Sequence, residues 1–354
     1  MNSKQNRGGK KFMKKFWKVL FAGSLAASLL AGCGDSGKTD AGKVVIYSPN
    51  TENEVNAIIP AFEEKTGIKV ELVQGKTGEL VTRIDSEKGN PQADILWGGM
   101  NLGVYTTNPD LWEKYVSPNE NLIDENYRNT TGYFTNYILS GSGCFILNNQ
   151  LMKELGVEIK GYKDLLQPKL KGKIASGDPT SSSSAWAELT NMLLVMGEKP
   201  YDEKAWDYVK DFVKQLNGVE LSSSSAIYKG VAEGEYAVGV SYEDPCVSLL
   251  QDGADVTVVY PEEGAVWLPA SVAIIKEAPN MEQAKAFIDF LISEDAQQII
   301  SGLTVRGTNT KIKSTNKFMK PMSEINVAYE DIPYCAEHKA EWQAKYADIK
   351  RDTK

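Results

Sequence analysis

Short apolar segments alternate with amphipathic segments of helical period between residues 43 and 99. The apolar segments are 43–48, 68–75 and 93–99, and the amphipathic segments are 52–67 and 77–89. Strands and helices that alternate at this pitch predict a parallel, doubly wound sheet. Ligands of such sheets bind beyond the carboxyl ends of the strands. The candidate binding loops are therefore 47–49, 75–78 and 97–99.

A second α/β run begins after a change of pattern near residue 140. There, two glycines precede an apolar run, which suits a strand that crosses from one half of the fold to the other. The pattern then predicts strands at 173–175, 236–245, 254–261 and 269–278, and helices at 180–197, 201–216, 226–235, 281–303 and 335–350. A chain of 354 residues allows two domains or one large α/β unit.

The N-terminus has the features of an export signal. Residues 1–18 contain seven Lys and Arg and no acid, and a short apolar run follows. This order describes a secretory signal, and the run is too short for a comfortable membrane span. Residues 30–33, LAGC, resemble the lipobox of bacterial lipoproteins, which implies cleavage before Cys33 and a diacylglycerol on its thiol. We predict a signal peptide at 1–32 and a lipidated tether at 33–42; an ordinary signal peptide with a chance cysteine is the alternative.

The exported chain is strongly acidic. Residues 33–354 contain 32 Lys and Arg against 47 Asp and Glu, a net charge of −15. Such a charge argues against binding nucleic acid or an acidic membrane surface through the overall field. A small anion can still bind locally, because helix N-termini and backbone amides act at short range. After Cys33 no apolar run reaches membrane-spanning length, so only the lipid would attach the protein to a membrane.

The sequence contains no catalytic or metal-binding motif in which the required side chains have a recognisable spacing. The only histidine, His338, lies in the predicted last helix. It is far in sequence from the serines at 181–184 and 222–225, which a nearby histidine would have to activate. The acid pair Glu243 and Asp244 would point to opposite sides of a strand. We therefore predict no catalysis, no cofactor and no metal. Once Cys33 is lipidated, three cysteines remain, and a disulfide between Cys144 and Cys246 is one alternative for an exported protein.

Two serine runs, 181–184 and 222–225, stand directly before predicted helices or within their first turns. Serine is a poor residue inside a helix and a good residue at its start. A helix N-terminus leaves several N–H groups unpaired and carries about half a positive charge. Hydroxyl groups around such a terminus suit a phosphate-sized anion. In the simpler reading, one serine caps each helix and the others are merely exposed.

Four longer segments resemble a known family. They are KVVIYSPNTENEVNAIIPAFEEKTGIKVELVQGKTGEL, ADILWGG, VAEGEYAVGVSYEDP and NMEQAKAFIDFLISEDAQQII, and together they span most of the chain after residue 43. They are similar to the extracellular solute-binding proteins of ABC importers, in the group that includes ferric-iron, phosphonate and sugar-phosphate receptors. The resemblance implies an α/β, type 2 periplasmic-binding-protein fold. Its two lobes would be joined by crossing segments near 139–145 and 262–270, with lobe 1 at 43–140 and 266–354 and lobe 2 at 141–265.

The resemblance also implies a ligand cleft between the lobes. Combined with the hydroxyl pattern, it gives these candidate ligand residues: Ser48, Thr77, Gly78, Ser181, Ser182, Ser183, Ser225, Tyr242 and Glu243. The predicted ligand is a small anionic solute, a sugar phosphate or a phosphonate, captured by hinge closure and delivered to an ABC permease. Tyr242 and Glu243 would accept hydrogen bonds from sugar hydroxyls or an ammonium group. The protein is expected to be a monomer, anchored through Cys33 on the outer face of the cell membrane.

Two other functions stay open at this level. Iron receptors of this family typically use two adjacent tyrosines, whereas this chain has no adjacent pair. Tyr242, Glu243 and Tyr47 could still bind a hard cation such as ferric iron. Alternatively, the closed protein would deliver its ligand signal to a membrane histidine kinase, because sensing and transport use the same closed conformation.

Overall fold

The structure, a computed structural model, describes residues 41–129 and 131–353. The predicted signal peptide at 1–32, the Cys33 anchor and the tether up to residue 40 lie outside the described residues. Among the described residues, no helix is both long enough and apolar enough to cross a membrane.

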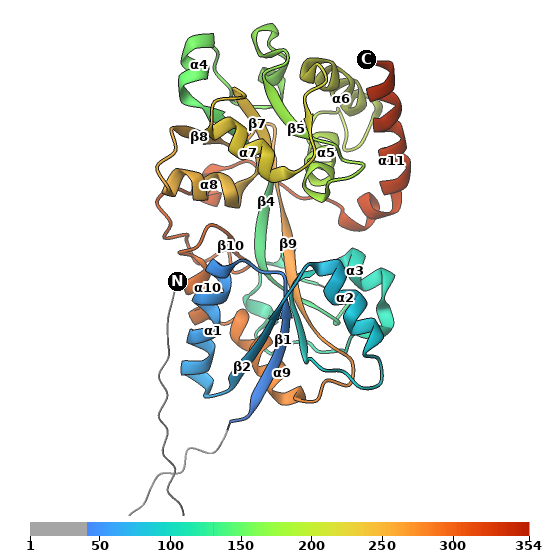
Figure 1. Cartoon of the computed structure of the whole chain (residues 1–354), viewed down its shortest axis with the longest axis vertical. Coiled ribbons are helices and arrows are strands. Elements are labelled where there is room, and N and C mark those ends of the chain that lie inside the picture. Colours follow the sequence, from blue (N-terminus) through green and yellow to red (C-terminus); the bar gives the residue numbers. More distant parts are fainter. Residues whose placement is uncertain (1–40, 130, 354) are drawn as a thin grey trace, which may run out of the picture. The chain divides into compact units, whose positions relative to one another are not determined.

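Helices and strands alternate along most of the described chain (Figure 1). The strands are β1 (Lys43–Ser48), β2 (Lys69–Gln74), β3 (Ile95–Met100), β4 (Thr135–Asn148), β5 (Ile174–Gly177), β6 (Glu220–Leu221), β7 (Val238–Tyr242), β8 (Val256–Val259), β9 (Ala265–Ile274), β10 (Arg306–Gly307) and β11 (Val327–Ala328). The α-helices are α1 (Glu52–Thr66), α2 (Thr77–Ser86), α3 (Leu102–Thr107), α4 (Asn149–Leu155), α5 (Ser183–Val195), α6 (Glu203–Leu216), α7 (Ser224–Ala232), α8 (Glu243–Gln251), α9 (Met281–Leu291), α10 (Glu294–Ile300) and α11 (Ile332–Asp352). Short 3-10 helices are η1 (Pro109–Leu111), η2 (Glu120–Leu122), η3 (Glu125–Tyr127), η4 (Tyr162–Leu166), η5 (Pro168–Leu170) and η6 (Met322–Glu324).

The sheet has the strand order β2-β1-β3-β9-β4-β7-β5-β6. β1 pairs in parallel with β2 and β3, and β5 pairs in parallel with β7 and β6. The long strands β4 and β9 pair antiparallel in the middle and connect the two halves (Figure 1). We call lobe 1 the half with β1–β3, α1–α3, α9 and α10, and lobe 2 the half with β5–β8 and α4–α8. The predicted α/β fold with two crossing segments is confirmed.

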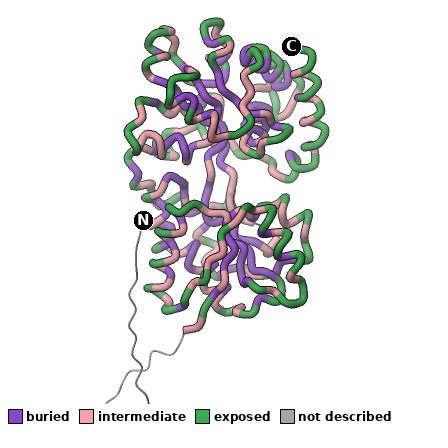
Figure 2. The backbone as a smooth tube through the Cα atoms, viewed as in Figure 1, coloured by how far each residue is buried: buried purple, intermediate pink, exposed green. Residues whose placement is uncertain are grey.

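The crossing point can be located from burial. β4 and β9 pair from Thr135 opposite Val272 to Ser142 opposite Val266. Along this ladder only Ser140 of β4 and residues 268–270 of β9 are half-buried, whereas the strand segments on either side are buried (Figure 2). The two lobes therefore have separate buried cores, and the backbone between them is the least covered part of the crossing strands.

The last helix differs from the predicted lobe assignment. The chain leaves lobe 1 at β11, which pairs with the start of β9. Helix α11 then packs on α6 of lobe 2, where Trp342 stacks on Tyr201 with ring centroids 5.3 Å apart and contacts Trp206 edge-on. The prediction that 266–354 belongs to lobe 1 is therefore wrong for 332–352. Periodicity reveals that this helix has an apolar face, but not which lobe covers it.

Several predicted elements also have different ends, and the strand predicted at 269–278 is β9 at Ala265–Ile274. The helix predicted at 281–303 is divided into α9 and α10, because Ser293 accepts a hydrogen bond from the backbone N–H of Ala296 and begins a new helix. The strand predicted at 236–245 ends at Tyr242, and Glu243 begins helix α8. Acidic residues are favoured in the first turn of a helix. The acid pair that was expected at a strand end therefore begins a helix.

Candidate functional site

The loops after β1 and β3 and the start of α2 meet in lobe 1. The hydroxyl of Ser48 donates to a carbonyl of β3 at 2.6 Å and accepts from the backbone N–H of Asn50 at 3.1 Å. Gly98 and Gly99 have left-handed φ values of 81° and 68°. A Cβ at Gly98 would lie 1.9 Å from Asn50 Oδ1, and one at Gly99 would lie 2.4 Å from Thr77 Oγ1. Both positions therefore require glycine, and the side chains of Asn50, Thr77 and Pro49 lie against the backbone there.

Helix α2 presents an uncapped N-terminus at this point. Its N-cap residue, Lys76, makes no side-chain hydrogen bond to the first turn. Thr77 and Gly78 are its first two residues, and no atom lies within 4 Å of the Cβ position of Gly78. The unpaired N–H groups and the helix dipole give this end a partial positive charge. Thr77 lies against the Cβ position of Gly99, and Ser48 is hydrogen-bonded to the carbonyl of Trp97 on the same strand.

In lobe 2, the first serine run forms the start of α5. Ser182 is the N-cap and accepts from the backbone N–H of Ala185 at 3.4 Å. Its hydroxyl lies 3.0 Å from that of Ser184, while Ser181 donates to the carbonyl of Asp178. One serine therefore caps the helix. The others add hydroxyl groups around the same N-terminus.

The second serine run forms the start of α7 in the same way. Ser223 is the N-cap, and its hydroxyl lies 3.2 Å from that of Ser225. At the end of β5, a Cβ on Gly177 would lie 2.9 Å from Ala185 of α5 and 3.7 Å from Ile227 of α7. The N-terminal turns of both helices therefore pack against the same strand end. Ser181, Ser182 and Ser183 are thereby brought close to the run that contains Ser225.

Tyr242 ends β7 beside these helices. Its ring packs edge-on against that of Tyr228, with centroids 6.4 Å apart. Burial, with smaller contributions from Tyr228 and Asp244, raises the pKa of Tyr242 to about 12. The phenol is therefore protonated at neutral pH and can donate a hydrogen bond to an anion.

Glu243 is placed differently from the other predicted ligand residues. It is 1% exposed, and its carboxylate accepts from Arg306 Nε at 2.9 Å, from Tyr260 Oη at 2.5 Å and from Trp267 Nε1 at 3.2 Å. Arg306 lies on β10, which pairs with the lobe 1 part of β4. The ion pair therefore joins α8 of lobe 2 to lobe 1, and protein donors occupy both carboxylate oxygens.

Other residues considered from the sequence lie away from these loops. The hydroxyl of Tyr47 donates to Glu87 at 3.0 Å, on the side of β1 that faces α2. Trp97 is fully buried and packs edge-on against Phe287. Asn50, Gly98 and Gly99 were not predicted individually. The glycine pair near the end of the apolar strand β3 was the available signal.

Potential metal ligands and the cysteines can be located within the described residues. In that part of the chain, no group of three or more His, Cys, Asp and Glu side chains could hold a metal ion. Cys144, Cys246 and Cys335 are buried free thiols. A hydrogen bond to Cys246, together with burial, raises the pKa of the Cys144 thiol well above its usual range. Cys144 and Cys246 are thus neighbours without being bonded.

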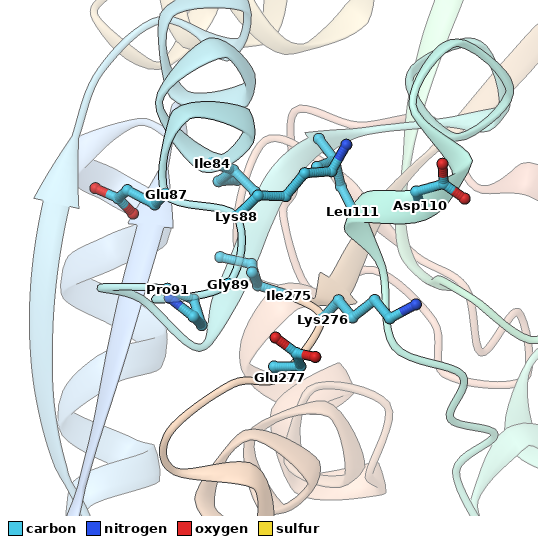
Figure 3. A pocket seen from close by; sticks show the side chains of 10 residues that line it. All are labelled: Ile84, Glu87, Lys88, Gly89, Pro91, Asp110, Leu111, Ile275, Lys276 and Glu277. Atoms are coloured by element: carbon cyan, nitrogen blue, oxygen red, sulfur yellow. The ribbon is translucent and has the colours of Figure 1, made fainter.

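Two pockets lie within single lobes. One, of about 330 Å³, lies at the C-terminal end of α2 and is lined there by Glu87 and Lys88 and, from the segment after β9, by Lys276 and Glu277 (Figure 3). Thr77 begins the same ten-residue helix, so this pocket is about 15 Å from the uncapped N-terminus. The other, of about 700 Å³, lies between the ends of α6 and α11. The two pockets contain charges of both signs and neither includes the α2 N-terminus.

Comparisons with known proteins agree with this geometry. The family model of the bacterial extracellular solute-binding proteins matches residues 57–321. Iron uptake protein A1 of Synechocystis is 26% identical over 78% of this chain and 80% of its own. A Salmonella typhimurium periplasmic protein, named as a candidate for 2-aminoethylphosphonate binding, is 26% identical over 69% of this chain and 70% of its own. The fructose-6-phosphate-bound structure of the periplasmic binding protein AfuA from Actinobacillus pleuropneumoniae is 27% identical, has a TM-score of 0.69 and covers 88% of this chain and 99% of its own.

Proposed function

This chain belongs to the bacterial extracellular solute-binding proteins, and we propose on that basis that it captures a sugar phosphate or a phosphonate for an ABC importer. The observation that carries the proposal is the set of helix N-termini beside the strand ends. α2 offers an uncapped N-terminus in lobe 1, and α5 and α7 start side by side in lobe 2. Such termini bind phosphate groups through N–H donors and the helix dipole.

The ligand residues divide between the two lobes. Ser48, Thr77 and Gly78 would contact the anion from lobe 1, and Ser181, Ser182, Ser183, Ser225 and Tyr242 from lobe 2. Rotation about the crossing strands would bring both sets onto the ligand and exclude water, which strengthens each hydrogen bond to the anion. Release to the permease would follow reopening. Glu243 would contribute through its ion pair with Arg306 at the hinge instead of by direct contact.

The binding site is tested by removing hydroxyl groups. The double variant Ser182→Ala with Ser183→Ala is expected to weaken binding at least tenfold, since two donors to a charged group are lost. A calorimetric titration with fructose 6-phosphate and with alkyl phosphonates measures this loss.

Loss of a helix cap needs its own control. Ser182→Ala also removes the cap of α5, at a cost of about 1 kcal/mol. Ser293→Ala removes an equivalent cap from α10, away from the site, and should leave affinity unchanged. Unchanged affinity in the double variant would refute the proposed site.

We also propose that Cys33 carries a lipid that holds the protein at the outer face of the cell membrane. The lipobox-like sequence before Cys33 supports this, although it lies outside the described residues. Replacing Cys33 with Ala should move the protein from the membrane fraction to the medium. Retention of the variant with membranes would contradict a lipid anchor at this position.

Ferric iron is the second candidate ligand, because Tyr228 lies beside Tyr242 and one relative is named as an iron uptake protein. An iron–phenolate complex absorbs visible light, whereas a phosphate-ester complex does not. The absorption spectrum of the protein mixed with ferric citrate therefore separates the two candidates. A visible band that is lost in Tyr242→Phe would favour iron.

A further inference from the structure

A buried acid, Glu54, and a half-buried acid, Asp244, lie near the proposed anion site without a cationic partner. Glu54 is in the first turn of α1 in lobe 1, and Asp244 is in the first turn of α8 in lobe 2. Within the described residues neither forms an ion pair with Lys or Arg. Their neighbour Glu243, by contrast, is neutralised by Arg306. The protein itself therefore leaves the charges of the buried Glu54 and the half-buried Asp244 without a compensating cation.

Only one of the two carboxyl oxygens of Glu54 takes part in capping the helix. Oε2 accepts from the backbone N–H and the hydroxyl of Thr51, which completes a capping box. Oε1 is buried and has no hydrogen-bond partner, and the residue as a whole is 9% exposed. A glutamine would complete the same capping box. The cap therefore does not require a carboxylate here.

Asp244 approaches Glu54 from the other lobe. It accepts a hydrogen bond from Thr304, and burial raises its pKa. Burial also raises the pKa of Glu54 to about 7, and the charge of Asp244 adds to that rise. An ionised carboxylate is costly in such a position unless a cation lies beside it.

Both acids are adjacent to residues of the anion site. Asn50, which covers Gly98, donates through Nδ2 to the hydroxyl of Tyr137 at 2.8 Å. Tyr137 in turn lies close enough to Glu54 for the carboxylate to raise the pKa of its phenol, which burial already raises. Asp244 follows Tyr242 by two residues and raises the pKa of that phenol. Asp244 is thus two residues from Tyr242, and Glu54 is connected through Tyr137 to Asn50, which covers Gly98.

We propose that Glu54 and Asp244 form a subsite for the ammonium group of a zwitterionic ligand whose other end is a phosphonate or phosphate. This inference rests on the proposed function and narrows its ligand class. A primary ammonium carries three donors, which match Oε1 of Glu54 and the acceptor oxygens of Asp244. The positive charge would compensate both carboxylates when the lobes close, and would link α1 to α8 through the ligand.

The experiment compares two ligands of nearly equal shape. 2-Aminoethylphosphonate and propylphosphonate differ by an ammonium group in place of a methyl group. Calorimetry should show that the unmodified protein binds the amine at least about tenfold more tightly. Glu54→Gln and Asp244→Asn should each remove most of that preference, while propylphosphonate affinity stays within about threefold of the original.

The variants are chosen to preserve the fold. Glu54→Gln retains the capping box, and Asp244→Asn retains an oxygen acceptor for Thr304. Glu52→Gln, an exposed acid in the same first turn of α1, is the matched control and should not change either affinity. Thermal unfolding of each variant checks that affinity changes do not arise from loss of structure.

The outcomes separate this inference from the function on which it rests. Equal affinity for the two phosphonates, or an unchanged preference in Glu54→Gln and Asp244→Asn, overturns the ammonium subsite. Tight binding of fructose 6-phosphate with no binding of 2-aminoethylphosphonate also overturns it, but leaves the proposed function intact. If none of the three compounds binds, the proposed function itself fails.

Discussion

Glu188 shows how a single residue can make stability depend on pH. It lies on α5 and is 1% exposed, and neither carboxyl oxygen has a hydrogen-bond partner. Burial raises its pKa well above the usual range of glutamate. The protonated form is favoured in the folded protein, whereas the unfolded chain releases this proton near pH 4.3. Stability from this residue is therefore complete below pH 4.3 and is lost as the pH rises toward the folded-state pKa.

The variant Glu188→Gln is expected to be more stable than the unmodified protein at pH 8, with a difference that shrinks as the pH is lowered toward 5. The slope of the difference should not exceed about 1.4 kcal/mol per pH unit, the value for one proton. Urea unfolding of both proteins between pH 5 and pH 8 measures this stability difference at each pH. Glu233→Gln, at an exposed glutamate, should show no such trend. A difference that stays constant with pH would mean that Glu188 is ionised when folded.

At the scale of elements, the contact of β10 with α8 joins the lobes beside the hinge. Arg306 of β10 pairs with Glu243 of α8, stacks over Trp267 with its guanidinium 5.2 Å from the ring centroid, and donates to the carbonyl of Lys320. Both charged side chains are almost fully buried. Removing one partner of such a pair leaves a buried charge uncompensated, whereas removing both does not.

We expect Arg306→Met to destabilise the protein by about 3–5 kcal/mol, and the added change Glu243→Leu to restore most of that loss. Urea unfolding of both single variants and the double variant completes the mutant cycle. The exposed pair of Lys43 and Glu71, with a 2.9 Å contact, provides a control: Lys43→Met should cost less than about 1 kcal/mol. A double variant as unstable as the sum of the single variants would show that the two residues act independently.

At the scale of the whole described unit, the half-buried stretch of β4 and β9 is where we propose that the lobes move relative to each other. Gly141 is part of this ladder and pairs with Trp267. A Cβ at Gly141 would lie 2.8 Å from Trp267 Nε1 and 3.1 Å from Glu243 Cβ. The absence of a side chain at Gly141 therefore allows the crossing strands to lie directly beneath the interlobe ion pair.

Saturating ligand should reduce the radius of gyration of the protein in X-ray scattering, because closure brings the lobes together. Gly141→Ala should diminish this change and weaken binding roughly tenfold, since crowding of this kind costs about 1–3 kcal/mol. Gly302→Ala serves as the control, because the nearest atoms to its Cβ position are at an ordinary 3.5 Å. If the radius does not change although ligand is bound, hinge closure would be refuted.

The sequence alone predicted those features of secondary structure whose physical cause lies in neighbouring residues. The period of apolar residues predicts most of the longer strands and helices of both lobes, because burial of one face requires that period. It does not predict the shorter helices α3, α4 and α8. The capping box of Thr51 and the left-handed Gly67 explain both ends of α1 from adjacent residues. Serine runs at the starts of α5 and α7 were likewise visible, since N-caps act within three residues.

Tertiary structure decided which of these local features meet. The serine runs share the end of β5, Glu243 faces an arginine 63 residues away in the chain, and α11 packs on lobe 2. Each depends on packing between segments distant in sequence, and neither periodicity nor capping specifies such partners. From the sequence alone, a carboxylate could equally well bind a ligand, form an ion pair with a basic side chain or remain protonated. The neighbours supplied by the fold distinguish Glu243, which is neutralised, from Glu54, which is not.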